Sequence, residues 1–267
     1  MLLPGGLWRD GARRRGFAFW PLTGEIELAV AEAGRAPHPV AAVTTVLAAA
    51  LAEVGGERAT PELVRELAVG DRQFLMRQLA AWLGCDGVWL TAPCGGCGAT
   101  FDLYVEQTAL PVKEAGEGYP FAAAETGRGR RRLRVPNGAD QEVIAGLAEE
   151  EAVAELRRRC LAEDEAANGA GTGDLAEADI AVFDAALEAV APEVGLVALA
   201  ACPDCGAEQR VTVDPYLCLT QAGSSLFGEI HALAMAYHWT EPAILALPAH
   251  RRRNYLQLID RTRGMAT

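Results

Sequence analysis

The pattern of hydrophobic and polar positions at the start of the chain predicts an arm followed by a compact helical unit. Residues 1–20 contain scattered aromatic residues without a regular period, so we expect an irregular arm. Over residues 21–84, apolar positions recur every three or four residues, which is typical of amphipathic helices. Thr60 and Asp71 are expected N-caps, because their side chains can accept bonds from the first helical amides. The predicted helices span 21–34, 39–56, 60–67 and 70–84.

The period changes to two at residue 86, which indicates β-strands. Apolar and polar residues alternate on both sides of two cysteines in 86–112, and the same arrangement returns in 194–219. The segment between them begins with an arginine-rich strand and a Pro-Asn-Gly turn, and then reads as mostly helical. Its predicted parts are helices at 149–164 and 175–192 and a glycine-rich flexible loop at 168–174.

Together these elements predict an α+β fold that is mainly α. Helical N- and C-terminal parts would surround a small, split, zinc-ribbon-like antiparallel β unit with a helical insertion. The expected segments are an N-terminal arm (1–20), a helical unit (21–84), a first ribbon hairpin (86–112), an acidic, mostly helical insertion (113–193), a second ribbon hairpin (194–219) and a C-terminal helical unit (220–267).

Two cysteine pairs carry the strongest chemical signal. With an offset of 108 residues, Cys94 aligns with Cys202 and Cys97 with Cys205, and each pair is followed by glycine and flanked by strands. A Cys-x-x-Cys-Gly turn directs two thiolates to one point, and its glycine permits a positive φ. Two such turns supply the four sulfur ligands of a tetrahedral zinc site. We therefore predict one structural zinc ion held by all four cysteines.

Other uses of these cysteines remain open. The 104 residues between the pairs far exceed the gap of a contiguous ribbon, although loop-closure entropy grows only logarithmically with length. The alternatives are a ribbon without bound metal and two separate hairpins with free thiols. Redox catalysis is less favoured, because a reactive Cys-x-x-Cys typically stands at a helix N-terminus and strands flank both pairs here.

The remaining cysteines and two histidines are interpreted as structural. Cys85, Cys160 and Cys218 have no partner at ligand spacing and are expected to be buried apolar thiols. His231 and His238 are seven residues apart on one predicted helix, whereas a helical metal pair would be three or four apart. We interpret them as core or capping histidines.

Charge is distributed unevenly along the chain. Residues 137–195 contain 15 acidic residues and three arginines, which accounts for the whole net charge of −12. A general nucleic-acid binder would need a basic excess. The run "RGRRRLR" (128–134) is therefore interpreted as a solvated strand that balances the acidic segment, with an acidic partner or nucleic acid as the alternative. The arginine triplets at 157–159 and 251–253 are expected to be solvated too.

No sequence signal favours catalysis, secretion or membrane insertion. The chain contains no Ser-His-Asp order, nucleophile elbow, phosphate loop or His-Glu-x-x-His motif. Its N-terminus has no secretory signal pattern, and the longest apolar run, 40–51, is too short to span a bilayer. We therefore expect a non-enzymatic cytoplasmic protein whose cysteines are reduced.

Several motifs resemble a known family. They are "LTGEIE", "LAVGDRQFLMRQL", "RVPNGADQEVIAGLA", "ELRRRC", the two Cys-x-x-Cys-Gly turns and "EIHALAMAYHWTEPAILALPAHRRRNYLQLI". Together these fragments, within residues 22–262, look like the baseplate assembly proteins of T-even-like phages and related contractile injection systems. The resemblance implies a structural or assembly factor without enzyme activity, whose partners are other baseplate and tail proteins.

Two rival hypotheses come from other functional classes. The first is a zinc-ribbon adaptor that binds nucleic acid or a nucleic-acid-processing complex, for which a basic, aromatic ribbon face is expected. The ribbon instead mixes Phe101, Tyr104 and Arg210 with acidic residues such as Asp102 and Glu208, which speaks against it. The second is an enzyme that uses the cysteines in thiol chemistry.

Overall fold

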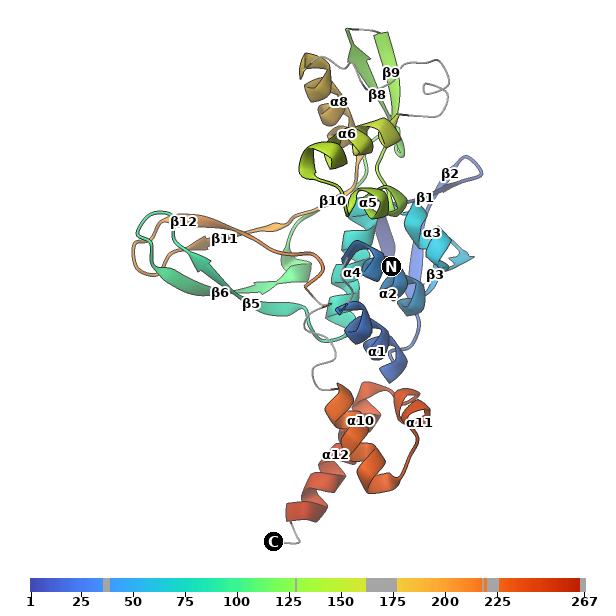
Figure 1. Cartoon of the computed structure of the whole chain (residues 1–267), viewed down its shortest axis with the longest axis vertical. Coiled ribbons are helices and arrows are strands. Elements are labelled where there is room, and N and C mark those ends of the chain that lie inside the picture. The colour runs from blue at the N-terminus through green and yellow to red at the C-terminus, as the bar shows by residue number, and fades with distance from the viewer. Residues whose placement is uncertain (36–38, 128, 162–176, 218, 220–225, 265–267) are drawn as a thin grey trace. The chain divides into compact units, whose positions relative to one another are not determined.

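The computed structural model describes residues 1–35, 39–127, 129–161, 177–217, 219 and 226–264 (Figure 1). The protein is α+β, and its strands form several small antiparallel sheets. The chain divides into two compact units, each assembled from separate segments. The first unit comprises 1–18, 53–75 and 110–196, and the second comprises 19–52, 76–109 and 197–267.

A four-stranded sheet in the order β1-β2-β3-β4 begins the chain, so the prediction of an irregular arm was wrong. An Asp10-Gly11 turn joins the first two strands, and both turn residues have positive φ (51° and 73°). This pair favours a tight hairpin, and the aromatic pattern of the arm obscured its signal. The strands are β1 (Leu2–Arg9), β2 (Ala12–Phe19), β3 (Leu51–Val54) and β4 (Glu57–Arg58).

The long helix predicted over 39–56 is shorter in the structure. Helix α2 (Pro39–Ala50) ends early, and the chain continues directly into β3. Gly55 and Gly56, predicted as a helix stop, form the turn of the β3–β4 hairpin with φ of 64° and 83°. In residues 51–54, Leu51 and Val54 are buried and Glu53 is exposed. This pattern fits a strand as well as the last turn of a helix, so the sequence did not distinguish the two.

The first unit contains a hairpin covered by helices. Strands β8 (Phe121–Thr126) and β9 (Gly129–Arg134) pair with each other, and helix α8 (Glu177–Val190) packs along β8 (Figure 1). Phe183, Leu133 and Cys160 are completely buried in the core between them. The unit also contains α3 (Pro61–Glu66), α5 (Gly138–Ile144), α6 (Glu149–Cys160), β7 (Val112–Lys113) and β10 (Glu193–Val194).

Most helix predictions in the first unit are confirmed. The Thr60 side chain caps α3 by accepting a bond from the Leu63 amide (3.2 Å). Asn137 and Asp140 form a capping box at the start of α5, after the predicted strand and turn. The glycine-rich loop at 168–174 and the start of the helix predicted at 175–192 lie outside the described residues. Strands β7 and β10 pair antiparallel, so the chain between them leaves and returns at neighbouring positions.

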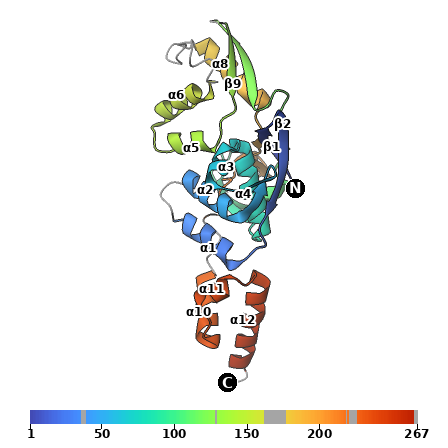
Figure 2. The same ribbon diagram turned by 90° about the vertical axis from the view of Figure 1, so that its right-hand side faces the viewer.

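The second unit contains α1 (Gly24–Ala33), α2 and two further hairpins that carry the cysteine pairs. Helix α4 (Val69–Trp82) includes residues of both units. Gly84 lies two residues after its end, and its φ of 78° fits the predicted C′ glycine. At the C-terminus, α10 (Leu226–Tyr237) and α12 (Ala249–Gly264) pack side by side, with α11 (Glu241–Leu245) between them in sequence (Figure 2). Leu233, Ile244 and Ile259 are buried in their small core, and partly buried residues that include Tyr237, Trp239 and Tyr255 pack against them.

Candidate metal centre

Two hairpins of the same construction carry the four cysteines. Strands β5 (Gly87–Pro93) and β6 (Thr100–Glu106) pair antiparallel, as do β11 (Val197–Ala201) and β12 (Glu208–Thr212). The two hairpins lie side by side and end in their cysteine turns (Figure 1). The β-type alternation therefore predicted the local structure at both sites correctly.

The two turns have the same hydrogen-bond pattern. In the first, the Gly98 amide donates to the Cys94 carbonyl (2.9 Å) and the Cys94 amide donates to the Ala99 carbonyl (2.8 Å). In the second, the amides of Gly206 and Cys202 make the equivalent bonds, both at 2.9 Å. Gly98 and Gly206 have φ of 77° and 71°, which confirms that the turn needs the left-handed conformation at this glycine.

The four sulfur atoms converge on one point. All of them lie within 4.8 Å of one another. Two sulfur contacts join different hairpins: Cys94 Sγ lies 3.6 Å from Cys205 Sγ, and Cys97 Sγ lies 3.8 Å from Cys202 Sγ. Four sulfurs bound tetrahedrally at about 2.3 Å from one zinc ion would be separated by about 3.8 Å. The cluster therefore has the composition and spacing to hold a single metal ion.

The backbone around the cluster favours thiolate at one position. Amides of Cys97 and Gly96 donate toward Cys94 and lower the pKa of its thiol to about 6. The pKa of Cys97 is raised to about 12, because contacts with the Cys205 and Cys94 thiols outweigh the bond from the Ala99 amide. Four thiols in one site cannot all ionise easily without a cation. A bound metal ion would supply the compensating positive charge.

Contacts between the hairpins help to hold the cluster together. The Gly95 amide donates to the Gln209 side-chain carbonyl across the hairpins (2.9 Å). A Cβ added at Gly96 would lie 3.4 Å from Ala207 Cβ, which shows how closely the second turn approaches the first. Cys94 and Cys202 are buried, whereas Cys97 and Cys205 are exposed. Sequence reasoning did not identify Gln209, because a glutamine on a strand carries no distinctive signal.

The other predicted cysteines and histidines lie elsewhere. Cys160 is completely buried, as predicted, and burial raises the pKa of its thiol to about 12. Cys85 is only half-buried, so the buried reading was wrong there; it follows Gly84 at the end of α4, where the chain leaves the packed helix. Cys218 lies outside the described residues. His231 and His238 are both exposed, which contradicts a core position. His238 directly follows α10, where it has a φ of 57° and its amide donates to the Ala234 carbonyl (2.9 Å), as a residue that caps a helix C-terminus does.

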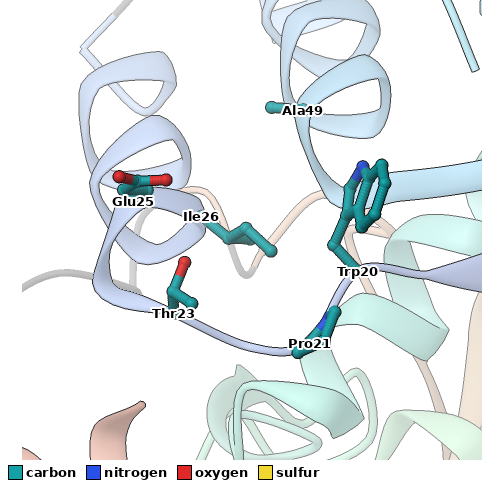
Figure 3. Close-up of a pocket in the computed structure, with 6 residues that line it drawn as sticks. All are labelled: Trp20, Pro21, Thr23, Glu25, Ile26 and Ala49. Atoms are coloured by element: carbon teal, nitrogen blue, oxygen red, sulfur yellow. The ribbon is translucent and has the colours of Figure 1, made fainter. Parts of the chain in front are cut away.

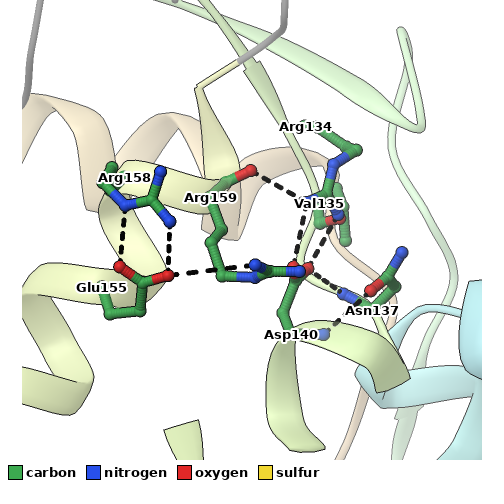
Figure 4. Close-up of polar contacts among 7 residues, drawn as sticks. All are labelled: Arg134, Val135, Asn137, Asp140, Glu155, Arg158 and Arg159. Carbon is green, nitrogen blue, oxygen red and sulfur yellow. Dashed lines mark hydrogen bonds and ion pairs between the residues drawn. The ribbon is translucent and has the colours of Figure 1, made fainter. Parts of the chain in front are cut away.

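The arginine runs are less solvated than predicted. Arg134 is half-buried and makes two bonds to Asp140, at 2.8 and 3.1 Å (Figure 4). Arg159 donates to the same carboxylate (2.8 Å), and so does the Asn137 amide (2.9 Å). Burial alone would raise the pKa of Asp140, but these bonds outweigh it and hold the pKa below its ordinary value. Arginines separated by 25 residues therefore share one buried carboxylate.

A second buried ion cluster lies in the second unit. Arg252 is 1% exposed and forms ion pairs with Glu27 and with Glu229, the latter at 2.9 Å. It also donates to the Leu247 carbonyl (2.8 Å). Burial raises the pKa of Glu27, and the attraction of Arg252 only partly offsets that rise. The expectation of a solvated 251–253 triplet was therefore wrong, because the partners of Arg252 are distant in sequence.

Asp71 is buried instead of capping α4. The helix begins at Val69, so Asp71 is its third residue. Its carboxylate accepts bonds from the Gly5 and Gly6 amides (2.7 Å each), where the pairing of β1 with β2 is irregular. Where strand pairing is irregular, backbone amides do not find acceptors on the neighbouring strand. The Asp71 carboxylate serves as the acceptor for two such amides, which explains why it is buried here. Burial raises the pKa of Asp71 to about 6, although both amide bonds oppose the rise.

A pocket of about 430 Å³ lies beside α1 in the second unit (Figure 3). Ile26 points toward Trp20 across it, and the lining also includes Pro21 and Ala49. Its polar groups are the Thr23 hydroxyl and the Glu25 carboxylate. The other lining residues are apolar.

Comparison with family models, curated proteins and solved structures found no significant match. Within the described part of the chain, no helix has both the length and the apolar character needed to cross a membrane.

Proposed function

We propose that this protein is a non-enzymatic structural or assembly factor for the baseplate or tail of a phage-like contractile injection system. We further propose that one structural zinc ion holds its two cysteine hairpins together as a split ribbon. Sequence motifs carry the first part of the proposal, and the four-sulfur cluster carries the second.

The observation that carries the assembly role is the meeting of three separate motifs at Arg252. Glu27 comes from "LTGEIE", Glu229 from "EIHALAMAYHW" and Arg252 from "AHRRRNYLQLI". Their charged groups form one buried cluster that links α1, α10 and α12. Three of the motifs that resemble the baseplate family therefore contribute to one set of ion pairs, which joins helices that are distant in sequence. This supports a shared architecture more strongly than scattered surface similarities would.

Motifs in the first unit also contribute charged groups that are buried and hydrogen-bonded. Asp71 belongs to "LAVGDRQFLMRQL", Asp140 to "RVPNGADQEVIAGLA" and Arg159 to "ELRRRC". Asp71 is completely buried, and Asp140 is 1% exposed and bonded to two arginines. A catalytic acid or base must reach its substrate. Carboxylates enclosed in this way are suited to holding segments together, which supports a structural protein.

Zinc is the metal that best suits the cysteine cluster. Four thiolates in a tetrahedron are typical of structural zinc sites, and the sulfur spacing fits that geometry. Cys94, Cys97, Cys202 and Cys205 would fill all four positions and leave none for a substrate or water. The ion would add folding energy and would stabilise the close approach of two hairpins that are distant in sequence.

The assembly role is tested by deleting the gene in a cell that produces the contractile particle. We expect sheath and tube proteins to accumulate without complete baseplates, as seen by electron microscopy, and the wild-type gene to restore particles. Mass spectrometry of purified particles distinguishes a permanent component from a factor that leaves after assembly. Normal particle numbers in the deletion strain would refute the proposal.

A further inference from the structure

An exposed aromatic pair lies on the β5–β6 hairpin, which belongs to the second unit (Figure 1). Trp89 on β5 stands directly opposite Tyr104 on β6, and the centroids of the two rings are 5.4 Å apart. Trp89 is nevertheless 70% exposed, and Tyr104 is 52% exposed. Large aromatic side chains are enriched where proteins bind one another. The pair therefore presents ring surface that a ligand can still bury.

The strand alternation separates this pair from the packed side of the hairpin. Val88, Leu103 and Val105 are buried, and they occupy the positions between the exposed ones. Residues two apart on a strand share a face, so Gly87 and Trp89 project on the same side as Tyr104. A Cβ added at Gly87 would lie only 1.9 Å from the Tyr104 hydroxyl oxygen. The missing side chain at Gly87 is thus what lets the tyrosine ring lie across the strands.

Two carboxylates flank the aromatic pair on the same face. Asp102 and Glu106 stand two residues before and two residues after Tyr104 on β6, and both are exposed. The Asp102 carboxylate accepts a bond from the Thr91 hydroxyl (2.6 Å), which orients it and leaves other lone pairs available. Residues 78–112 contain no lysine or arginine. This hairpin therefore carries negative charge beside its rings and no cation of its own.

We propose that this face binds an arginine-containing segment of a partner protein. A guanidinium is planar, so it can stack on the Trp89 ring and still donate to a carboxylate beside it. Asp102 and Glu106 each lie about 7 Å along the strand from Tyr104, within reach of an arginine that contacts the rings. Charge-assisted bonds to these carboxylates would fix the position of the segment.

The charge of the face selects this occupant. Both ionised groups on it have the same sign, so they repel a nucleic acid, an acidic peptide and an anionic membrane alike. A neutral apolar segment would cover the rings but would leave the two carboxylates without partners. An arginine segment satisfies the rings and the carboxylates together.

This inference rests on the proposed function in one respect, namely that the occupant is a protein partner. The binding test below uses only purified full-length protein and synthetic ligands. A negative result would therefore overturn the inference and leave the assembly phenotype of the deletion strain as an independent question.

The test measures fluorescence anisotropy of a labelled eight-residue peptide of alternating arginine and glycine. We expect saturable binding to the wild-type chain and a Kd at least about fivefold weaker for Trp89→Thr, because the change removes the better cation–π partner. Leu199→Thr is the matched control, since Leu199 is an exposed apolar residue on β11 of the other cysteine hairpin, and it should leave Kd unchanged.

A second pair of variants tests the carboxylates without touching the rings. Asp102→Asn/Glu106→Gln should weaken Kd at least about threefold, because it removes two charges and retains the acceptor for Thr91. Glu208→Gln/Asp214→Asn is the matched control in the other hairpin. Both of its residues are exposed, and Asp214 likewise accepts a bond, from the Tyr216 amide (2.8 Å). This control removes the same charge from the chain and should leave Kd unchanged.

The chemistry of the peptide supplies the third arm. The arginine peptide should bind at least about threefold tighter than a lysine peptide of equal charge, because only the guanidinium is planar. The corresponding citrulline peptide, which is neutral, should not bind. Circular dichroism and thermal unfolding verify that each variant is folded, and the two pairs of variants test the face independently of each other.

Several outcomes would overturn the proposal. They are absence of saturation at about 1 mM arginine peptide, equal Kd values for wild type and Trp89→Thr, and an equal loss of affinity in a variant and its matched control. Tighter binding of a single-stranded oligonucleotide or of phosphatidylcholine vesicles that Trp89→Thr abolishes would assign the face to another ligand. A dimer that Trp89→Thr dissociates, measured by sedimentation, would assign it to a second copy of the chain.

Discussion

If the four cysteines share one zinc ion, the free energy of unfolding should depend on the concentration of free zinc with a slope that can be calculated. Since all four sulfurs lie within 4.8 Å, the cluster has room for one ion at its centre. A single ion that binds only the folded state stabilises it by RT ln(1 + [Zn]/Kd). Above Kd, the free energy of unfolding should therefore rise by about 1.4 kcal/mol for each tenfold increase in free zinc. Two independent ions would double that slope, and separate hairpins without metal would give none.

The assay is urea unfolding in a series of zinc buffers, combined with metal quantification of the purified chain. We expect one zinc ion per chain and a slope near the single-ion value. Cys202→Ser, which removes a buried ligand, should abolish the slope. Cys85→Ser is the matched control, because Cys85 is a half-buried cysteine outside the cluster, and it should preserve the slope. A folded sample with less than about half an ion per chain and no zinc dependence would refute the shared site.

Three further predictions concern the buried charges. Arg252→Met should reduce the free energy of unfolding by about 3–5 kcal/mol, measured by urea unfolding, because it leaves the partly buried carboxylates of Glu27 and Glu229 without their cation. Asp140→Ala should reduce the free energy of unfolding by a similar amount, because the change leaves two arginines without the carboxylate that they share. A reduction below about 1 kcal/mol would contradict a buried ion cluster. Asp71 has a folded pKa of about 6 against an ordinary value of 3.8, so its contribution to stability should decrease as pH rises from about 4 to about 6. Asp71→Asn should remove that component from the pH dependence, and an unchanged difference between the two proteins across this range would contradict the shift.

The four-cysteine cluster was predictable from sequence because the residues that define each turn are local and occur twice. Each turn needs two cysteines at fixed spacing and one glycine with positive φ, and flanking alternation indicates the strands. The agreement between Cys94 and Cys202, and between Cys97 and Cys205, pointed to one shared site despite the long gap. Spacing alone did not reveal which cysteines approach most closely. The structure of the paired hairpins shows that sulfur contacts of 3.6 and 3.8 Å join different turns.

The buried ion clusters escaped prediction for the opposite reason. Arg252 and Glu27 are 225 residues apart, and each stands in a motif that also suits a solvated helix face. An arginine triplet on a helix gives no sign of which member is buried, because burial depends on the element packed against it. The N-terminal strands were missed for a different reason. The Asp10-Gly11 sequence is typical of a hairpin turn, but Pro4, Gly5 and Gly6 interrupt the alternation of apolar and polar residues in β1. Local turn chemistry was the better guide there.

The cysteine cluster and the buried arginine join parts of the second unit that have little stabilisation of their own. Its cysteine hairpins are each two-stranded in the described structure, and an isolated two-stranded hairpin is marginally stable in water. The C-terminal helices have a small core, in which three buried residues are surrounded by side chains that are only partly buried. Each of these parts therefore needs a directional link to adopt one arrangement. The proposed zinc ion on the four cysteines would provide that link for the hairpins, and Arg252 with its two glutamates provides it for the helices. This division explains why the chain retains costly buried charge where apolar packing would otherwise be expected.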